Sequence, residues 1–216
     1  MYWWLFLLCP LAYLLGGLNF SKLVARLRHV DLSAVGSGNA GATNVGRALG
    51  FGWFVLVIIA ELLKGAAIVA AGYLFSSLWT GEYNFTLAHY IVMLSVGVAG
   101  IFGDIFPVWY RFRGGKGIAT WIGMGFFLNP LMMLFDAIVF IPLLCLTRIM
   151  SISTLLGALC WAVLTFTPFS WMFQAPFTWY LAVLYAAIVV LLFFSHRKNL
   201  VRLFTGQEKK ISFKKK

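Results

Sequence analysis

Long apolar runs are the feature that most constrains how this chain can fold. Runs long enough to cross a hydrocarbon core of about 30 Å lie at residues 2–20, 50–79, 85–108, 131–147, 152–168 and 177–195. A seventh run, residues 118–128, is shorter and meets its neighbour at Asn129 and Pro130, where proline favours a tight turn. With 62% hydrophobic residues and a mean hydropathy of +0.92, the chain is predicted to be an all-α, polytopic membrane protein. We expect about seven transmembrane helices in a single domain, residues 1–216.

The basic residues favour one orientation in the membrane. Seven spans alternate their connecting loops between two faces, and all of the 17 Lys and Arg residues except Lys64 fall on one face. Positive charge collects on cytoplasmic loops. We therefore expect the amino terminus outside and a basic cytoplasmic tail from about residue 196. The net charge of +11 needs no nucleic-acid partner, because orientation and attraction to anionic lipid headgroups account for it.

The cysteines and the other metal-ligand residues indicate no cofactor. Cys9, Cys145 and Cys160 lie singly inside apolar runs, which is typical of packing residues rather than of a disulfide framework. No cluster of metal-ligating residue types occurs in the sequence. We expect no metal requirement.

A polar, glycine-rich stretch, residues 36–47 ("GSGNAGATNVGR"), lies in a connection that runs from residue 21 to 48. Connections of this length are usually functional or disordered. Small residues let a backbone approach a ligand closely, and successive amide groups form concavities that bind anions. The stretch therefore predicts a phosphate site, with a flexible interfacial loop as the alternative. It lacks the Gly-Lys-Ser/Thr ending of a Walker loop.

A second stretch on the same face, residues 103–120, combines cations with glycines. Arg111, Arg113 and Lys116 surround a Gly-Gly-Lys-Gly turn, residues 114–117, that opens the next predicted helix. Cations and a helix amino terminus both favour an anion. A basic stop signal that only fixes the topology would explain the charges but not the glycines.

A third stretch, residues 195–211, leaves the last apolar run on that same face. His196 and Asn199 are three residues apart, so they lie on one side of a helical extension. Arg202 and the following lysines can hold headgroups. A surface residue is the alternative for His196.

Charged residues inside the apolar runs are a further class of candidates. Glu61 and Lys64 are spaced to pair on one helix face, and Asp104 and Asp136 lie near predicted helix ends. Charged groups are costly to bury in lipid, which makes them functional candidates. A purely structural pair is the alternative for Glu61 and Lys64.

In their order and on their shared face, the three stretches resemble the three cytoplasmic motifs of the bacterial acyl-phosphate:glycerol-3-phosphate acyltransferases, the PlsY family. Residues 36–47 resemble the first motif, residues 106–120 the second and residues 196–211 the third. The resemblance implies a seven-helix enzyme of the bacterial inner membrane with its active site on the cytoplasmic face. It would transfer an acyl group from acyl phosphate to the 1-hydroxyl of glycerol 3-phosphate, giving lysophosphatidic acid and inorganic phosphate, the first step of phospholipid synthesis. We expect a monomer that contacts membrane lipids.

The resemblance also implies which residues act. The catalytic residues would be His196, Lys116 and Arg47. The substrate-binding residues would be Ser37, Gly38, Asn39, Asn44, Arg47, Gly114, Gly115, Lys116, Ser151, Ser153, His196 and Asn199. Ser151 and Ser153 belong to a segment, residues 147–153, that resembles the family's central serine region, and either serine can be the one that acts. The hydroxyl proton can pass to His196 or to a phosphate oxygen of the substrate, and we favour the substrate.

Two positions depart from the family pattern. Asp104 stands where members usually have histidine, and Glu61 stands where they often have aspartate. The second change is conservative. The first removes any role of that histidine in proton handling, and we expect Asp104 to be structural, paired with a nearby basic residue such as Arg111 or Arg113.

A transporter or lipid flippase is the alternative function, because charged residues within spans also fit an ion or substrate pathway. The sequence shows no internal repeat, and its informative polar residues cluster at one face, which favours the enzyme. None of the three histidines is followed by aspartate five positions later. The motif of soluble-type acyltransferases, and with it the main argument for an acyl-CoA donor, is therefore absent.

Overall fold

The computed structural model of the chain describes residues 5–166 and 178–211. Over these two ranges it contains ten α-helices, one 3-10 helix and no strand. In chain order the elements are α1 (Leu5–Gly16), α2 (Phe20–Leu27), α3 (Ala42–Leu49), α4 (Phe51–Thr80), α5 (Leu87–Ile105), η1 (Val108–Tyr110), α6 (Ile118–Leu128), α7 (Pro130–Thr147), α8 (Met150–Phe166), α9 (Trp179–Ser195) and α10 (Arg197–Phe204). Residues 2–4, 167–168 and 177 of the predicted runs, and Lys214, Lys215 and Lys216 of the tail, lie outside the described residues.

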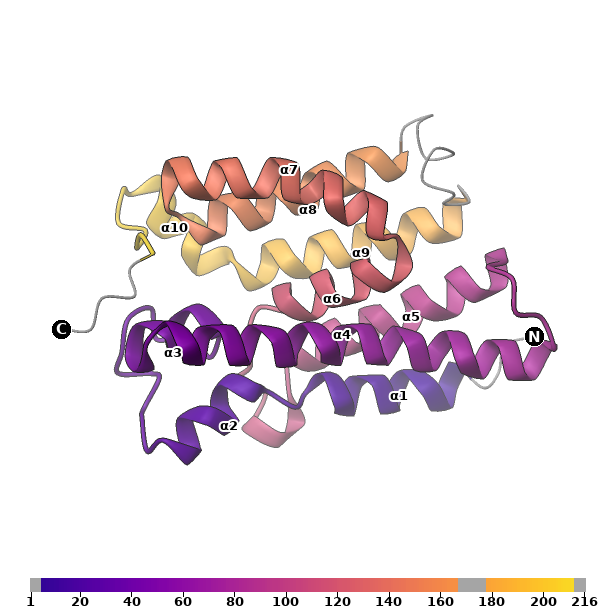
Figure 1. Cartoon of the computed structure of the whole chain (residues 1–216), viewed down its shortest axis with the longest axis horizontal. Coiled ribbons are helices and arrows are strands. Elements are labelled where there is room, and N and C mark those ends of the chain that lie inside the picture. Colours follow the sequence, from indigo (N-terminus) through magenta and orange to yellow (C-terminus); the bar gives the residue numbers. More distant parts are fainter. Residues whose placement is uncertain (1–4, 167–177, 212–216) are drawn as a thin grey trace.

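The long helices run side by side along the longest axis of the molecule, and the short helices α2, α3 and α10 gather at one end of the bundle (Figure 1). The first turn of α1 lies at the opposite end. The connection between α4 and α5 and the turn between α6 and α7 also lie at that opposite end (Figure 1). The three polar stretches are thus collected at one end, as the alternation of loops predicted.

Each of the seven apolar runs overlaps one of the described helices α1 and α4 to α9, although α4, α7 and α8 each extend one or two residues beyond the run. Four segments are long and apolar enough to cross a membrane: Leu7–Leu27, Phe51–Thr80, Leu87–Tyr110 and Pro130–Thr147. The bent pair α9 and α10 makes a fifth if it is counted as one span, while α6 and α8 are apolar but shorter. The all-α membrane fold is confirmed for the described part of the chain, and the number of seven crossings stays a prediction.

Close backbone contacts at glycines bring the helices together. A Cβ atom at Gly65 of α4 would lie 2.1 Å from the carbonyl oxygen of Thr120 in α6, and one at Gly123 of α6 would lie 1.9 Å from that of Leu62 in α4. Only glycine permits these two approaches. Helix α6, which begins immediately after the basic Gly-Gly-Lys-Gly turn, is therefore fixed tightly against α4.

The main core lies among α5, α6, α8 and α9. Met93, Leu94 and Ile101 of α5 pack there with Trp121 of α6 and Trp161 of α8. The two tryptophan rings are 5.1 Å apart and tilted. This core supports the helices from which the polar end is built.

The side chains of Glu61 and Lys64 form hydrogen bonds with the backbone between α1 and α2. The ammonium of Lys64 donates to the carbonyl oxygens of Gly16 (2.9 Å) and Leu18 (3.0 Å), while Glu61 Oε1 accepts from the backbone amide of Phe20 (2.9 Å). These bonds satisfy backbone groups that helix ends leave without partners. Lys64 Nζ also lies 2.5 Å from Glu61 Oε2, so the predicted pair is confirmed.

The predicted turn at Asn129 and Pro130 is also confirmed. Asn129 ends α6 and caps α7, its Oδ1 accepting from the amide of Met132 at 3.0 Å, and Pro130 begins α7. At the polar end, α9 and α10 meet at His196 with a bend of 58°. The bend turns α10 out of the bundle direction.

Candidate active site

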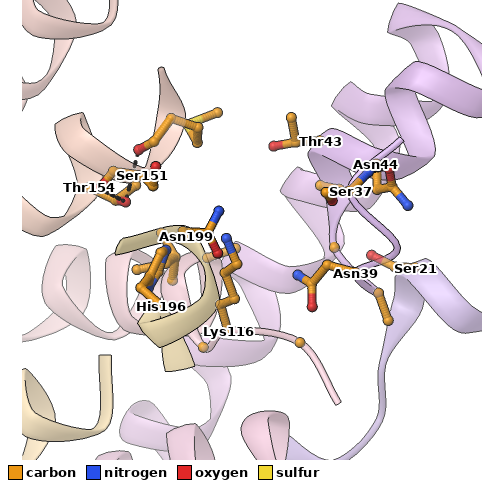
Figure 2. Close-up of a pocket in the computed structure, with 18 of the residues that line it drawn as sticks. Ser21, Ser37, Asn39, Thr43, Asn44, Lys116, Ser151, Thr154, His196 and Asn199 are labelled. Atoms are coloured by element: carbon orange, nitrogen blue, oxygen red, sulfur yellow. Dashed lines mark hydrogen bonds between the residues drawn. The ribbon is translucent and has the colours of Figure 1, made fainter. Parts of the chain in front are cut away.

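A cavity of about 290 Å³ lies where the polar stretches meet. Nine of the predicted site residues line it: Ser37, Asn39, Asn44, Arg47, Gly115, Lys116, Ser151, His196 and Asn199. They come from all three motif-like stretches and from the central serine segment. Figure 2 shows Ser151 and Thr154 on one side, Ser37, Asn39 and Thr43 on the other, and Lys116 with Asn199 between them.

The first stretch owes its shape to Asn44, which is buried in α3. Its Nδ2 donates to the carbonyl oxygens of Leu32 (2.9 Å) and Val35 (3.0 Å), and its Oδ1 accepts from the amide of Ser37 (3.0 Å). The side-chain amide is therefore occupied in holding the loop that presents Ser37. Arg47 is three residues further along α3, on the same side of the helix, and lines the cavity.

The second stretch places a single cation in the cavity. Lys116 lines it, whereas Arg111 and Arg113 are exposed and do not. Gly117, with a φ of 78°, turns the chain into α6, and Gly114 packs so closely that a Cβ there would lie 2.0 Å from the carbonyl oxygen of Asp104. The glycines thus fix the loop that carries Lys116.

The third stretch places His196 and Asn199 at the bend between α9 and α10. Nδ1 of His196 lies 2.8 Å from the carbonyl oxygen of Leu192. A carbonyl oxygen only accepts, so Nδ1 carries the hydrogen in this bond and Nε2 of the neutral ring is an acceptor. Ser195 Oγ lies 3.0 Å from the carbonyl oxygen of Lys116, to which it donates, and this joins the second stretch to the third.

The two candidate serines of the central segment occupy different environments. Ser151 lines the cavity, and its hydroxyl donates to Glu208 Oε1 at 3.0 Å. Ser153 is fully buried, does not line the cavity, and donates to the carbonyl oxygen of Ile149 in the preceding turn (3.2 Å). The geometry therefore favours Ser151.

Glu208, in the tail, was not singled out from the sequence. Its carboxylate accepts hydrogen bonds from Ser151 at 3.0 Å, from Asn199 Nδ2 at 2.5 Å and from Arg202 Nε at 2.9 Å. The tail continues across the cavity, where Lys209 donates to the carbonyl oxygen of Gly36. This hydrogen bond connects the third stretch to the first.

Two carboxylates, Glu61 and Asp104, also line the cavity. Asp104 Oδ2 accepts from Thr120 Oγ1 at 2.8 Å and lies 3.9 Å from Lys64 Nζ. Asp104 pairs with a basic residue, as expected, but that residue is Lys64 rather than Arg111 or Arg113. Both arginines lie on the exposed loop before Gly114, whereas the carboxylate points into the bundle towards α4 and α6.

Comparison with known proteins identifies the chain's relatives. A family model described as glycerol-3-phosphate acyltransferase matches residues 6–206. The chain belongs to this family. The glycerol-3-phosphate acyltransferase of Aquifex aeolicus is 36% identical over 201 residues, which cover 91% of this chain and 94% of the relative. That of Shouchella clausii is 38% identical over 206 residues, covering 94% and 93%.

Solved structures of the family share the fold. The crystal structure of PlsY, an integral membrane glycerol 3-phosphate acyltransferase, in its glycerol 3-phosphate form has a TM-score of 0.80 and 31% identity, with 96% of each chain covered. Its lysophosphatidic acid form has a TM-score of 0.78 and 30% identity, with 97% and 96% covered. The resemblance to the PlsY family is confirmed, and the chain is a membrane acyltransferase of that family.

The electrostatics of this acyltransferase's cavity favour an anion. Burial lowers the pKa of the Lys116 ammonium to about 8; Glu208 opposes this shift, and two nearby arginines add to it. Burial likewise lowers the pKa of the Arg47 guanidinium. Although burial alone would raise the pKa of the Glu208 carboxyl, its three hydrogen-bond donors hold that pKa below its usual value. Cations held in a partly dry site interact strongly with a bound anion.

The acyltransferase cavity also has an apolar wall. It is formed by residues of α4, α6, α7 and the start of α8: Ile58, Leu62, Ile118, Ile122, Phe140 and Met150. Ile58 and Leu62 are one helical turn apart, as are Ile118 and Ile122. The wall therefore continues from the polar end along the helices, the direction in which an acyl chain would enter the bilayer.

Three predicted site residues do not line the cavity: Gly38, Gly114 and Ser153. Gly38, with a φ of 70°, forms a turn in the first stretch. Sequence reasoning missed Thr43, Thr154 and Glu208, which do line it. Helical spacing could have found Thr154, which is three residues from Ser151, but no local pattern marks Glu208.

Proposed function

We propose that the protein transfers a fatty acyl group from acyl phosphate to the 1-hydroxyl of glycerol 3-phosphate, releasing lysophosphatidic acid and inorganic phosphate. The observation that carries the proposal is the convergence of Arg47, Lys116 and His196, from three distant segments, on one cavity with an apolar wall. The two similar PlsY structures are a glycerol 3-phosphate form and a lysophosphatidic acid form, which correspond to the same acceptor and the same lipid product.

The cations supply the recognition of phosphate. Arg47 can bind a phosphate through two parallel hydrogen bonds, and Lys116 acts as a point charge. The Ser37 hydroxyl and the Asn199 amide add uncharged donors at the same cavity. Two phosphorylated substrates need more than one cation. Arg47 and Lys116 come from different segments, so each can bind the phosphate of one substrate.

The chemistry requires no covalent intermediate. The 1-hydroxyl oxygen attacks the acyl carbonyl carbon, the bond between that carbon and the bridging oxygen breaks, and the bridging oxygen leaves with the phosphate. Holding two substrates in near-attack geometry can supply roughly 7–11 kcal/mol of the barrier reduction. Donors near the developing oxyanion add to this. The residues present offer positioning and charge, which is what an already activated acyl donor needs.

The hydroxyl proton has two acceptors within the proposed site. Nε2 of His196 is the acceptor nitrogen of the ring, and a phosphate oxygen of the donor is the other acceptor. A protonated His196 would place a second cation beside Lys116 in a buried site. We therefore assign the proton to the leaving phosphate and give His196 the role of orienting the hydroxyl by accepting its hydrogen bond.

The distribution of charged residues indicates the face of the membrane on which the cavity opens. The cavity lies at the end that carries the Lys and Arg residues, so it opens on the cytoplasmic face of a bacterial inner membrane. The protein works as a monomer, without a metal or an organic cofactor, and takes its lipid substrate from the surrounding bilayer.

The decisive assay uses the purified protein in detergent with long-chain acyl phosphate and glycerol 3-phosphate. We expect phosphate and lysophosphatidic acid in equal amounts, and no product when acyl-CoA replaces acyl phosphate. Phosphate release that does not depend on glycerol 3-phosphate would mean simple hydrolysis. Product from acyl-CoA alone would overturn the proposed donor.

A further inference from the structure

One end of the cavity is acidic. Glu61 and Asp104 are each only 5% exposed, and both line the cavity. Among the described residues only Lys64 pairs with them, at 2.5 Å from Glu61 Oε2 and 3.9 Å from Asp104 Oδ2. Two carboxylates therefore face one ammonium, which is also bonded to two backbone carbonyls. A phosphate is unfavourable at this end, whereas an uncharged hydrogen-bond donor is favourable.

Asp104 has one oxygen available for such a donor. Its Oδ2 is held by Thr120 Oγ1 at 2.8 Å, but no hydrogen bond from the described residues reaches Oδ1. Oδ1 lies beside the backbone of Gly115, where a Cβ would come within 3.1 Å of the Ala40 carbonyl oxygen, 3.2 Å of Oδ1 and 3.3 Å of Asn19 Nδ2. Asp104 and Gly115 both line the cavity, so a ligand that enters it can approach Oδ1.

The acidic end lies next to the phosphate-binding end. Lys116 follows Gly115 directly in the chain, and both line the cavity. A small substrate whose phosphate is held by Lys116 can reach Asp104, because Gly115, Lys116 and Asp104 line the same cavity. A polyol phosphate suits this arrangement, with its charged group on the cations and a hydroxyl on the carboxylate.

We propose that Asp104 determines the choice of acyl acceptor by accepting, at Oδ1, a hydrogen bond from the C2 hydroxyl of glycerol 3-phosphate. This inference rests on the proposed function. An ionised carboxylate only accepts hydrogen bonds, so it favours a hydroxyl at C2 and repels the carbonyl oxygen that dihydroxyacetone phosphate has there. The histidine that resembling proteins usually carry can donate as well as accept, which makes aspartate the stricter choice.

The test compares kcat/KM for three acceptors: glycerol 3-phosphate, dihydroxyacetone phosphate and 3-hydroxypropyl phosphate, which lacks the C2 hydroxyl. We expect the wild type to prefer glycerol 3-phosphate over each of the others by roughly tenfold to a hundredfold, the usual effect of a hydrogen bond to a charged group. In Asp104→Asn the side-chain amide can donate to a carbonyl. The preference over dihydroxyacetone phosphate should fall by about tenfold or more.

Two further variants separate recognition from structural damage. Asp104→His restores the usual residue of the family, and it should also lower the preference for glycerol 3-phosphate over dihydroxyacetone phosphate. Glu61→Gln removes a charge from the same cluster but leaves Oδ1 of Asp104 in place. Its kcat/KM values should therefore change by the same factor for both acceptors, with their ratio kept.

Two results would overturn the inference. One is an unchanged ratio in both Asp104 variants with equally lowered rates, which would make Asp104 a structural residue. The other is equal use of glycerol 3-phosphate and 3-hydroxypropyl phosphate by the wild type, a measurement that needs no variant to fold. Failure of the proposed function looks different, because the wild type would then acylate none of the three acceptors.

Discussion

Individual side chains at the polar end have distinct tasks that the sequence only partly revealed. The Gly-Gly-Lys-Gly turn marked Lys116 from residue type and spacing, whereas the roles of Arg47 and His196 followed from the resemblance to the PlsY family. Tertiary contacts determine which of the other polar side chains lie at the cavity. Ser151 and Ser153 differ in the face of α8 that each occupies. The carboxylate of Glu208 in the tail accepts a hydrogen bond from Ser151, 57 residues away in the sequence. Such contacts leave no local pattern.

The ionisation of Lys116 predicts a pH limit. The pKa of Lys116, lowered by burial to about 8, means that the ammonium of the empty site is charged below that pH and neutral above it. Since kcat/KM reports the free enzyme, its value for glycerol 3-phosphate should fall about tenfold per pH unit above pH 8. Steady-state rates from pH 6 to 10 measure this.

A matched variant tests the assignment of that limit. Lys116→Arg keeps its charge at all of these pH values, so whatever activity it retains should lack the alkaline fall. A flat wild-type profile would contradict the predicted pH limit, and the same fall in Lys116→Arg would show that another group causes it.

His196 should matter less than a general base would. If the leaving phosphate takes the proton, His196→Ala loses only an orienting hydrogen bond, and kcat should drop by roughly tenfold, whereas removal of a general base typically costs 10²–10⁴-fold. Single-turnover rates with saturating substrates measure this, with His29→Asn on the exposed surface as the control. A loss of more than about a thousandfold would make His196 the base.

Helices were easier to predict than the short elements between them. The run 118–128 coincides with α6 (Ile118–Leu128), because an apolar run bounded by glycine and Asn-Pro has clear ends. Helix α3 (Ala42–Leu49) was not predicted. It has eight residues and includes a glycine, so its own helix propensity is weak, and packing against α4 and the bonds of Asn44 stabilise it instead.

The contact between α4 and α6 should be sensitive to one methyl group. In Gly123→Ala the new Cβ would meet the carbonyl oxygen of Leu62 at 1.9 Å, and because both partners are backbone, the helices must separate. Overpacking of this kind costs about 1–3 kcal/mol, and it displaces the loop that carries Lys116. The melting temperature in detergent and the activity should both fall.

Gly52→Ala is the matched control for that substitution. Gly52 lies near the start of α4, and a Cβ there meets nothing within 4 Å. The variant should be as stable as the wild type or slightly more so, by roughly 0.4–1 kcal/mol. Equal melting temperatures for Gly123→Ala and the wild type would show that the two helices are not tightly apposed.

The molecule as a whole has two unlike ends. The first turn of α1 and the connection that contains Glu82 lie at one end, whereas α10 and the motif-like stretches lie at the other (Figure 1). The distribution of Lys and Arg predicts which connections share an end, because topology depends on charge rather than on contacts. What it could not predict is how closely the stretches approach.

Accessibility labelling tests the orientation. In a background without Cys9, Cys145 and Cys160, Glu82→Cys should react with an impermeant maleimide added to intact cells. Lys198→Cys should react only after the membrane is opened, since both side chains are exposed but at opposite ends. The reverse pattern would place the cavity outside the cell.

The central claim is that segments far apart in the chain form one pocket that holds two phosphorylated substrates for acyl transfer. The most direct measurement is lysophosphatidic acid formed from acyl phosphate and glycerol 3-phosphate by the folded variants Lys116→Ala, Arg47→Ala and Lys198→Ala. We predict no detectable product from the first two and a wild-type rate from the third, an exposed lysine outside the cavity. Near-normal rates in both Lys116→Ala and Arg47→Ala would contradict the account.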